Sequence, residues 1–271
     1  MIGFRAAAAF GICAGCHSAM AAEQSPPAAG WTVTARGNGY LSPAYEGSSS
    51  LAPLATPSLS VRRAGTSAPF FAPDDSIGLA LFDASWLKAG VAGKFKAARA
   101  VAGHPELKGL QSVDWTLEGG VFAELWPMEK LRTRIEVRRG FHGHEGVVGN
   151  VAADWVERIG PWTLSGGPRL AFANDRFMST YYSVTPLQSQ LSGVLPPYRA
   201  KAGLKSAGVA AAARYQWDRH WETMLYAQYD RLAANAARSP IVARVGSRDQ
   251  YTAGLAVSYA FDIAPLGFGG M

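Results

Sequence analysis

Two histidines separated by a single glycine, His142 and His144 in the stretch "HGHE", are the first residues whose spacing suggests chemistry. On a β-strand both imidazoles would share one face, where they could bind a metal ion together. Zinc normally takes at least three protein ligands, and no third His or Cys lies nearby in the sequence. Gly140, Gly143 and Gly146 favour a turn in which the histidines simply form hydrogen bonds. We therefore predict no metal site and no cofactor.

Hydrolysis by a serine, a histidine and a carboxylate is the second chemistry that the residue types allow. Glu136 precedes the two histidines and serines are frequent, but no nucleophile elbow and no ordered triad is visible. The segment "GSSS" (47–50) has the composition of a loop and lacks the strand–loop–helix setting of a phosphate-binding loop. We expect a protein that is not an enzyme and assign no catalytic residue. A triad assembled from separate strands remains an open alternative.

Charged side chains alternate with apolar ones in two consecutive segments, "SVDWTLEGGVFAEL" and "KLRTRIEVRR". The first segment has acids on its polar face and the second has mostly bases, which suits a polar lumen with ion pairs between strands. A three-residue turn at 127–129 would set Glu124 opposite Arg132 and Glu118 opposite Arg138. The candidate lumen-lining residues are Lys94, Asp114, Glu118, Glu124, Arg132, Arg134, Glu136 and Arg138.

The elements that position these residues are β-strands, because the apolar residues recur with a period of two and no helical period competes over a useful length. The predicted strands are Trp31–Tyr40, Ala55–Arg63, Ser76–Asp83, Trp86–Lys96, Ser112–Leu125, Lys130–Arg139, Val147–Arg158, Trp162–Asn174, Arg176–Thr185, Lys201–Trp217, Trp221–Leu232 and Tyr251–Phe261. Short turns fall near residues 84, 127, 160 and 219, a spacing that breaks strict alternation with longer loops before residue 200. We expect about twelve strands, an even number between ten and fourteen.

The composition favours a transmembrane antiparallel β-barrel, an all-β fold. The chain has 30 glycines, 8 tryptophans and 10 tyrosines in 271 residues, with a mean hydropathy of +0.01, as expected when half of each strand faces lipid and half faces water. The net charge of +6 is dispersed among apolar residues, so we expect no nucleic-acid partner. Tryptophans flank the predicted turns and form a candidate aromatic girdle of Trp126, Trp162, Trp217 and Trp221.

The first residues indicate export. "MIGFR" is a short basic region, "AAAAFGICAG" is apolar, and Ala19-x-Ala21 offers a cleavage site, so residues 1–21 are a predicted signal peptide. A lipoprotein signal at Cys16 is the alternative. Both cysteines lie inside residues 1–21, which leaves the mature chain without a disulfide framework. We predict a barrel over residues 22–261, closed by a strand with Leu255, Val257, Tyr259 and Phe261 on its lipid face, and a flexible tail over 262–271.

Five segments in the same order resemble the MipA/OmpV family of Gram-negative outer-membrane proteins. They are "GYLSPAYEGS", "RRGFHGHEGVVGNV", "GPWTLSGGPRLAFANDRFMSTYYSVT", "QSQLSGVLPPYRAKAG" and "YDRLAANAARSPIVARVGSRDQYTAGLAVSYAF". Together they span Gly39 to Phe261. The chain departs from the family pattern at "YYSV", where a Phe-Gly pair is usual, and in residues 262–271, which extend beyond the usual terminal Phe. The resemblance implies a barrel in the outer membrane, in contact with its lipids, whose final strand carries the assembly signal.

The resemblance also implies a function, because family members are described as scaffolds that bring a lytic transglycosylase and a murein synthase together. We expect a non-enzymatic scaffold that binds these periplasmic partners through turns and termini, or outside partners through the loops near 186–199 and 233–247. The alternatives are a small-solute channel or transporter with a charged lumen, an adhesin, and a barrel that hydrolyses lipids.

Overall fold

The computed structural model describes residues 30–66 and 68–263, so the predicted signal peptide and most of the predicted tail lie outside the described residues. The strands are β1 (Trp31–Pro43), β2 (Leu51–Arg63), β3 (Ile77–Asp83), β4 (Leu87–Lys96), β5 (Thr116–Met128), β6 (Leu131–His142), β7 (Val147–Ile159), β8 (Trp162–Ala173), β9 (Gly203–Gln216), β10 (Trp221–Leu232) and β11 (Asp249–Ile263). The helices are α1 (Asp175–Tyr182), α2 (Pro186–Ser192), α3 (Ala234–Arg238), α4 (Pro240–Ala243) and the 3-10 helix η1 (Pro105–Leu107). None of the described helices is long and apolar enough to cross a membrane.

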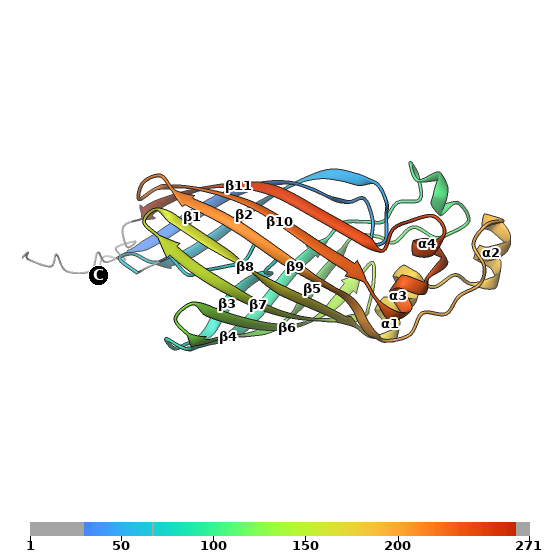
Figure 1. Cartoon of the computed structure of the whole chain (residues 1–271), viewed down its shortest axis with the longest axis horizontal. Coiled ribbons are helices and arrows are strands. Elements are labelled where there is room, and N and C mark those ends of the chain that lie inside the picture. The colour runs from blue at the N-terminus through green and yellow to red at the C-terminus, as the bar shows by residue number, and fades with distance from the viewer. Residues whose placement is uncertain (1–29, 67, 264–271) are drawn as a thin grey trace, which may run out of the picture.

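The eleven strands form one antiparallel sheet that curls into a barrel (Figure 1). Its order is β2-β1-β11-β10-β9-β8-β7-β6-β5-β4-β3, so β1 pairs with β11 and the sheet remains open between β2 and β3. The all-β barrel fold predicted from alternation is therefore confirmed. One predicted strand was wrong: residues Arg176–Thr185 contain α1 instead, which reduces the predicted twelve strands to eleven in the described chain.

The two ends of the barrel differ in the length of their connections. Four short turns (84–86, 129–130, 160–161 and 217–220) lie at one end, which we call the turn end. The other end, which we call the loop end, carries all four α-helices, the longer β1–β2, β4–β5, β8–β9 and β10–β11 connections and the four-residue β6–β7 connection (Figure 1). With the false strand removed, the four short turns all fall at one end, which resolves the irregular spacing seen in the sequence.

Apolar side chains cover the outer surface of the sheet. On β11, Leu255, Val257, Tyr259 and Phe261 are exposed, while Ala256 and Ser258 between them are buried, as the alternation predicts. β11 continues two residues beyond the predicted last residue Phe261, because Ile263 and Asp262 still pair with β1.

Exposed aromatic residues gather at the turn end, where they suit the headgroup level of a bilayer. Trp162, Trp217 and Trp221 are exposed there, and Trp221 packs on Tyr259 at a ring distance of 4.7 Å. Trp126 is a correction, because its indole nitrogen donates to the Glu124 carboxylate inside the barrel (3.0 Å). It continues the even-numbered, inward face of β5 and so points away from lipid.

The residues between β2 and β3 pass back through the barrel. Both strands run towards the turn end, because Arg63 pairs with Trp31 there and Asp83 precedes a short turn. The chain after β2 must therefore return from the turn end before β3 begins. We call residues 64–66 and 68–76 the inner segment. It contacts inward side chains of β1, β5, β6, β8 and β9, which only a segment inside the curled sheet can reach together.

The free edge of β2 is marked by two prolines, Pro53 and Pro57. Proline has no N–H and is tolerated in a sheet mainly on an edge, where that position faces away from a hydrogen-bonded neighbour. β2 is hydrogen-bonded only to β1 among the described strands. The two prolines therefore favour an unpaired edge on β2, because they hinder hydrogen bonding to a further strand there.

Candidate functional site

A continuous chain of ion pairs lines the lumen. It joins residues of β5, β6, β7 and β8 and ends at His144, in the β6–β7 connection at the loop end. The successive ion pairs are Arg169–Asp154 (2.8 Å), Asp154–Arg132 (3.0 Å), Arg132–Glu124 (2.8 Å), Glu124–Arg134 (3.3 Å), Arg134–Glu136 (2.7 Å), Glu136–Arg138 and Arg138–Glu118 (3.0 Å). Beyond them, Glu118 is hydrogen-bonded to the His144 imidazole (3.1 Å). Every side chain in this chain is buried, and that of Arg132 is 0 % exposed. Alternating signs compensate for the loss of water around each charge.

The predicted ion pairs form, but through a different strand register. Arg132 reaches Glu124 and Arg138 reaches Glu118, as expected from the sequence. The residue opposite Glu124 is nevertheless Arg134, because the register of β5 and β6 shifts between Leu125 and Met128 and the turn tightens to residues 129–130. The long arginine side chains bridge the two-residue offset diagonally.

The inner segment is held in the lumen by its two aspartates. The Asp74 carboxylate accepts from Nε and Nη2 of Arg169 (2.8 and 3.0 Å), and Asp75 accepts from Arg132 (2.6 Å). Charge-assisted bidentate contacts of this kind are the stronger and more specific ion pairs. The segment therefore adds two acids to a wall that is rich in arginine.

Two phenylalanines of the inner segment occupy the lumen nearer the turn end. Phe71 lies 3.6 Å from the Arg36 guanidinium and 4.5 Å from that of Arg214, both measured to the ring centre. Phe70 meets the Trp126 ring edge-on at 5.9 Å. Cations over aromatic faces are attractive, and more so when they are shielded from water. The segment thus fills this part of the barrel with aromatic side chains and not with water alone.

Helix α1 covers the lumen at the loop end. Asn174 caps its first turn by accepting from the Phe177 N–H (3.1 Å), and the Arg99 guanidinium donates to the Tyr181 carbonyl at its last turn (2.9 Å). Phe177 and Tyr181 pack edge-on against His144, at ring distances of 5.0 and 5.6 Å. The buried face of α1 therefore covers the ion-pair chain at the loop end.

A second charged cluster connects α1 to strands β4 and β9. Glu46, in the loop after β1, forms ion pairs with Lys96 at the end of β4 and Lys205 on β9 (3.1 Å to Lys205), and accepts from the Tyr182 hydroxyl (2.7 Å). Burial opposes ionisation of Glu46, but Lys205 and Lys96 outweigh it and hold the pKa of this carboxyl well below its usual range. Burial and the neighbouring Glu46 charge raise the pKa of Tyr182 well above its usual value.

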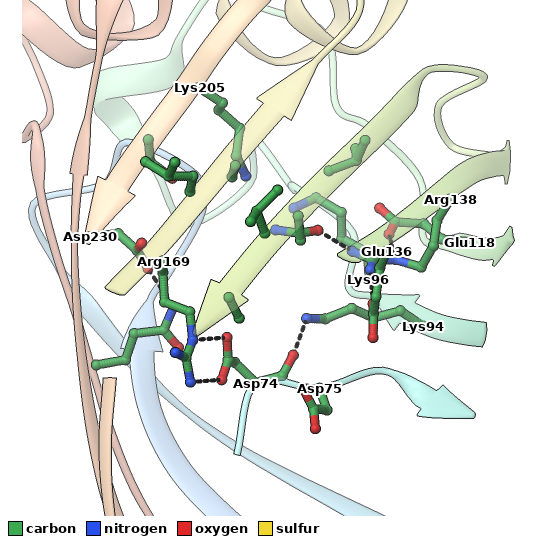
Figure 2. Close-up of a pocket in the computed structure, with 18 of the residues that line it drawn as sticks. Asp74, Asp75, Lys94, Lys96, Glu118, Glu136, Arg138, Arg169, Lys205 and Asp230 are labelled. Atoms are coloured by element: carbon green, nitrogen blue, oxygen red, sulfur yellow. Dashed lines mark hydrogen bonds and ion pairs between the residues drawn. The ribbon is translucent and has the colours of Figure 1, made fainter. Parts of the chain in front are cut away.

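A cavity of about 220 Å³ lies between the inner segment and α1 (Figure 2). Its walls carry side chains from both charged clusters and from the inner segment, including Asp74, Lys94, Glu136, Lys205 and Asp230. The lumen thus contains a charged cavity, with the phenylalanines of the inner segment on its turn-end side and α1 on its loop-end side. A smaller cavity of about 120 Å³, beside Phe70 and Arg214, lies towards the turn end.

Seven of the eight candidate lumen-lining residues lie on the inner face of the barrel, and six of these belong to the ion-pair chain. Lys94 faces the cavity but forms no ion pair among the described residues. Asp114 is a correction: it is exposed in the loop before β5, because that strand begins only at Thr116.

The two histidines of "HGHE" do not share a face. His142 ends β6 with a positive φ of 80° and packs on Trp115, whereas His144 is buried against Glu118. Gly143 between them cannot be larger, because a Cβ there would meet the Asp114 carbonyl. No group of three or more His, Cys, Asp or Glu side chains in residues 30–66 and 68–263 is arranged to hold a metal ion.

Several residues of the site were missed from the sequence. Asp154 and Arg169 lie on predicted strands but were not singled out, although Asp154 alternates with apolar neighbours as the chosen residues do. Glu46, Asp74 and Asp75 lie in connections, where alternation gives no signal. Their partners are 50 or more residues away in the chain.

Solved structures similar to this chain include two porins and a neisserial surface protein. The NanC porin is 10 % identical, with 84 % of this chain and 98 % of that chain covered at a TM-score of 0.39. The KdgM porin is 10 % identical, with 85 % and 99 % covered and a TM-score of 0.36, and the Neisserial surface protein A is 10 % identical, with 86 % and 99 % covered and a TM-score of 0.28. A comparison with curated proteins finds no significant match.

A family model described as MltA-interacting protein MipA matches residues 37–261. The match begins in β1 and ends in β11, so it includes the strands that carry the ion-pair chain, the inner segment and α1. It confirms the resemblance inferred from the five sequence segments. The chain belongs to the MipA family.

Proposed function

We propose that this protein is a non-conducting outer-membrane barrel that serves as an interaction scaffold for a murein-remodelling lytic transglycosylase. The observation that carries the proposal is the occupied lumen. The inner segment is fixed across it by the Asp74–Arg169 and Asp75–Arg132 ion pairs, and α1 covers the loop end. A barrel built for passive diffusion would keep its lumen open to water.

The partner is supported by the family's description as an MltA-interacting protein. In outer-membrane barrels the short turns face the periplasm, so we propose the turn end as the docking surface. Charges there include the exposed Lys130 and Arg219 and the partly exposed Glu157. Rim charges of this kind steer a partner and set its orientation more than they add affinity.

The test has two arms on the purified full chain. In planar bilayers we expect no stable conductance steps. In surface plasmon resonance, an immobilised barrel should bind purified lytic transglycosylase, and Lys130→Glu with Arg219→Glu should weaken binding about tenfold by slowing association. Arg176→Glu, an exposed change at the loop end, is the matched control and should bind normally.

Stable ion-conducting steps that change with Arg134→Glu would overturn the proposal in favour of a channel. Absence of transglycosylase binding, or equal weakening by the loop-end control, would overturn the scaffold. Lipid hydrolysis by the pure protein, abolished by one serine or histidine substitution, would contradict both.

A further inference from the structure

The cavity between the inner segment and α1 has walls of balanced charge. Six acidic and six basic residues line it: Glu46, Asp74, Asp75, Glu118, Glu136 and Asp230, and Lys94, Lys96, Arg134, Arg138, Arg169 and Lys205. Ten of these twelve form an ion pair with an opposite charge within 4.0 Å. A wall in which charges are already paired gives a bound solute no net preference for either sign.

Of these twelve, Lys94 and Asp230 are the two that form no ion pair with another described residue. The Lys94 ammonium donates only to the Asp74 main-chain carbonyl (3.2 Å), and the Asp230 carboxylate accepts only from the Gln228 amide (2.6 Å). Opposite charges lie near both groups, but neither makes a direct ion pair, so the ammonium and the carboxylate retain donor and acceptor capacity for an ionic ligand.

These two residues lie on opposite walls of the barrel. Lys94 belongs to β4 and Asp230 to β10, which are separated by five strands on one side and by β11, β1, β2, the open seam and β3 on the other. Figure 2 shows them on either side of the Asp74–Arg169 pair, with both side chains at the cavity. Much of the Lys94 side chain is free of contact with other described residues, so its ammonium can meet a ligand in the cavity.

We propose that this cavity binds a small zwitterionic solute, with its carboxylate on Lys94 and its ammonium on Asp230. The size fits, because an apolar cavity of about 150 Å³ holds benzene, and 220 Å³ has room for a molecule the size of a dipeptide. A zwitterion satisfies both free charges at once. A singly charged solute of the same size leaves one of them without a partner, and this difference makes the site selective.

The experiment measures binding of radiolabelled L-alanyl-L-alanine to the purified, folded protein in detergent micelles by equilibrium dialysis. N-acetyl-L-alanyl-L-alanine, which lacks the ammonium, and L-alanyl-L-alaninamide, which lacks the carboxylate, are the comparison probes. We expect the zwitterion to bind at least tenfold more tightly than either derivative. Equal affinity for all three probes, or no binding of the zwitterion at millimolar concentration, would overturn the proposal.

Two variants assign the ends of the ligand. Lys94→Met should weaken zwitterion binding at least tenfold without weakening the amide, whose carboxylate is already missing. Asp230→Asn should do the same for the zwitterion and leave the N-acetyl form unaffected. Lys88→Met on the same strand is the control, because Lys88 pairs with Asp83 at the turn end and does not line the cavity.

The comparison of probes uses the wild-type protein, so it tests the proposal even if a variant fails to fold. Folding of each variant is checked by the heat-dependent mobility of the barrel in gel electrophoresis. If both variants fold and neither changes the affinity, the assignment is wrong. The outcome does not depend on whether a transglycosylase binds the turn end.

Discussion

Arg132 is the residue on which the packing of the lumen depends most directly. Its side chain is fully buried and binds three carboxylates, those of Asp75, Glu124 and Asp154. Arg132→Met keeps much of the volume but leaves these acids with fewer partners. Removing one member of a buried ion pair costs about 3–5 kcal/mol.

The expected loss lies at the lower end of that range, because two of the three acids keep a close partner. Glu124 still contacts Arg134 at 3.3 Å, and Asp154 still contacts Arg169 at 2.8 Å. Asp75 retains only a longer contact with Arg134, at 3.6 Å. We therefore expect the free energy of unfolding to fall by about 3 kcal/mol.

Urea unfolding in phospholipid vesicles, followed by tryptophan fluorescence, measures this loss. Arg139→Met is the matched control, because Arg139 is exposed on the outer face of the same strand and should change stability by less than about 1 kcal/mol. Adding Asp75→Asn to Arg132→Met should recover part of the loss, since it removes the acid left with the weakest partner. A loss below about 1 kcal/mol for Arg132→Met, or equal losses for the two arginine variants, would refute the reasoning.

Three further predictions concern the loop end and the end of the chain. Glu46→Gln should lower the free energy of unfolding by about 2 kcal/mol at pH 7; because the pKa of Glu46 is depressed in the folded protein, its contribution is complete above its ordinary pKa of 4.5 and shrinks below it, so urea titrations at pH 7 and pH 3 should show a smaller difference at pH 3. Gly146→Ala should cost about 1–3 kcal/mol, because the new Cβ would meet the backbone of Phe177 in α1, whereas Gly39→Ala, with open space around it, should be neutral in the same titration. Deletion of residues 264–271 should leave assembly into the membrane unchanged, as judged by heat-dependent gel mobility, because β11 as far as Ile263 already pairs with β1 back to its first residue, Trp31; loss of the folded band would contradict this.

Alternation was sufficient to predict most strands because it depends only on neighbouring residue types. The inward acids and bases of β5 and β6 follow from the same rule. The register between these strands did not, because it is set by the bulge between Leu125 and Met128, which no alternating pattern encodes.

The α1 segment was mistaken for a strand because its aromatic residues favour strands by propensity. The evidence for a helix was present in the sequence: Asn174 is a good N-cap residue, and the buried Phe177, Met178, Tyr181 and Tyr182 recur with helical spacing. The irregular order of short and long connections pointed to an error in the same region.

The inner segment lay beyond sequence reasoning for a different reason. Nothing local indicates that Asp74 and Asp75 enter a barrel, since their partners Arg169 and Arg132 follow 95 and 57 residues later. The segment has no regular periodicity and contains two prolines, so its place is determined by tertiary contacts alone.

The inner segment also couples the width of the barrel to the filling of its lumen. It is joined at one end to β2 and at the other to β3, the only two described strands with a free edge. If these edges move apart, the tether between them is stretched, and the load falls on the contacts of Asp74 and Asp75. A change in lipid composition or lateral tension that widens the seam would therefore pull on the inner segment through the polypeptide itself. No ligand would be needed to transmit the signal.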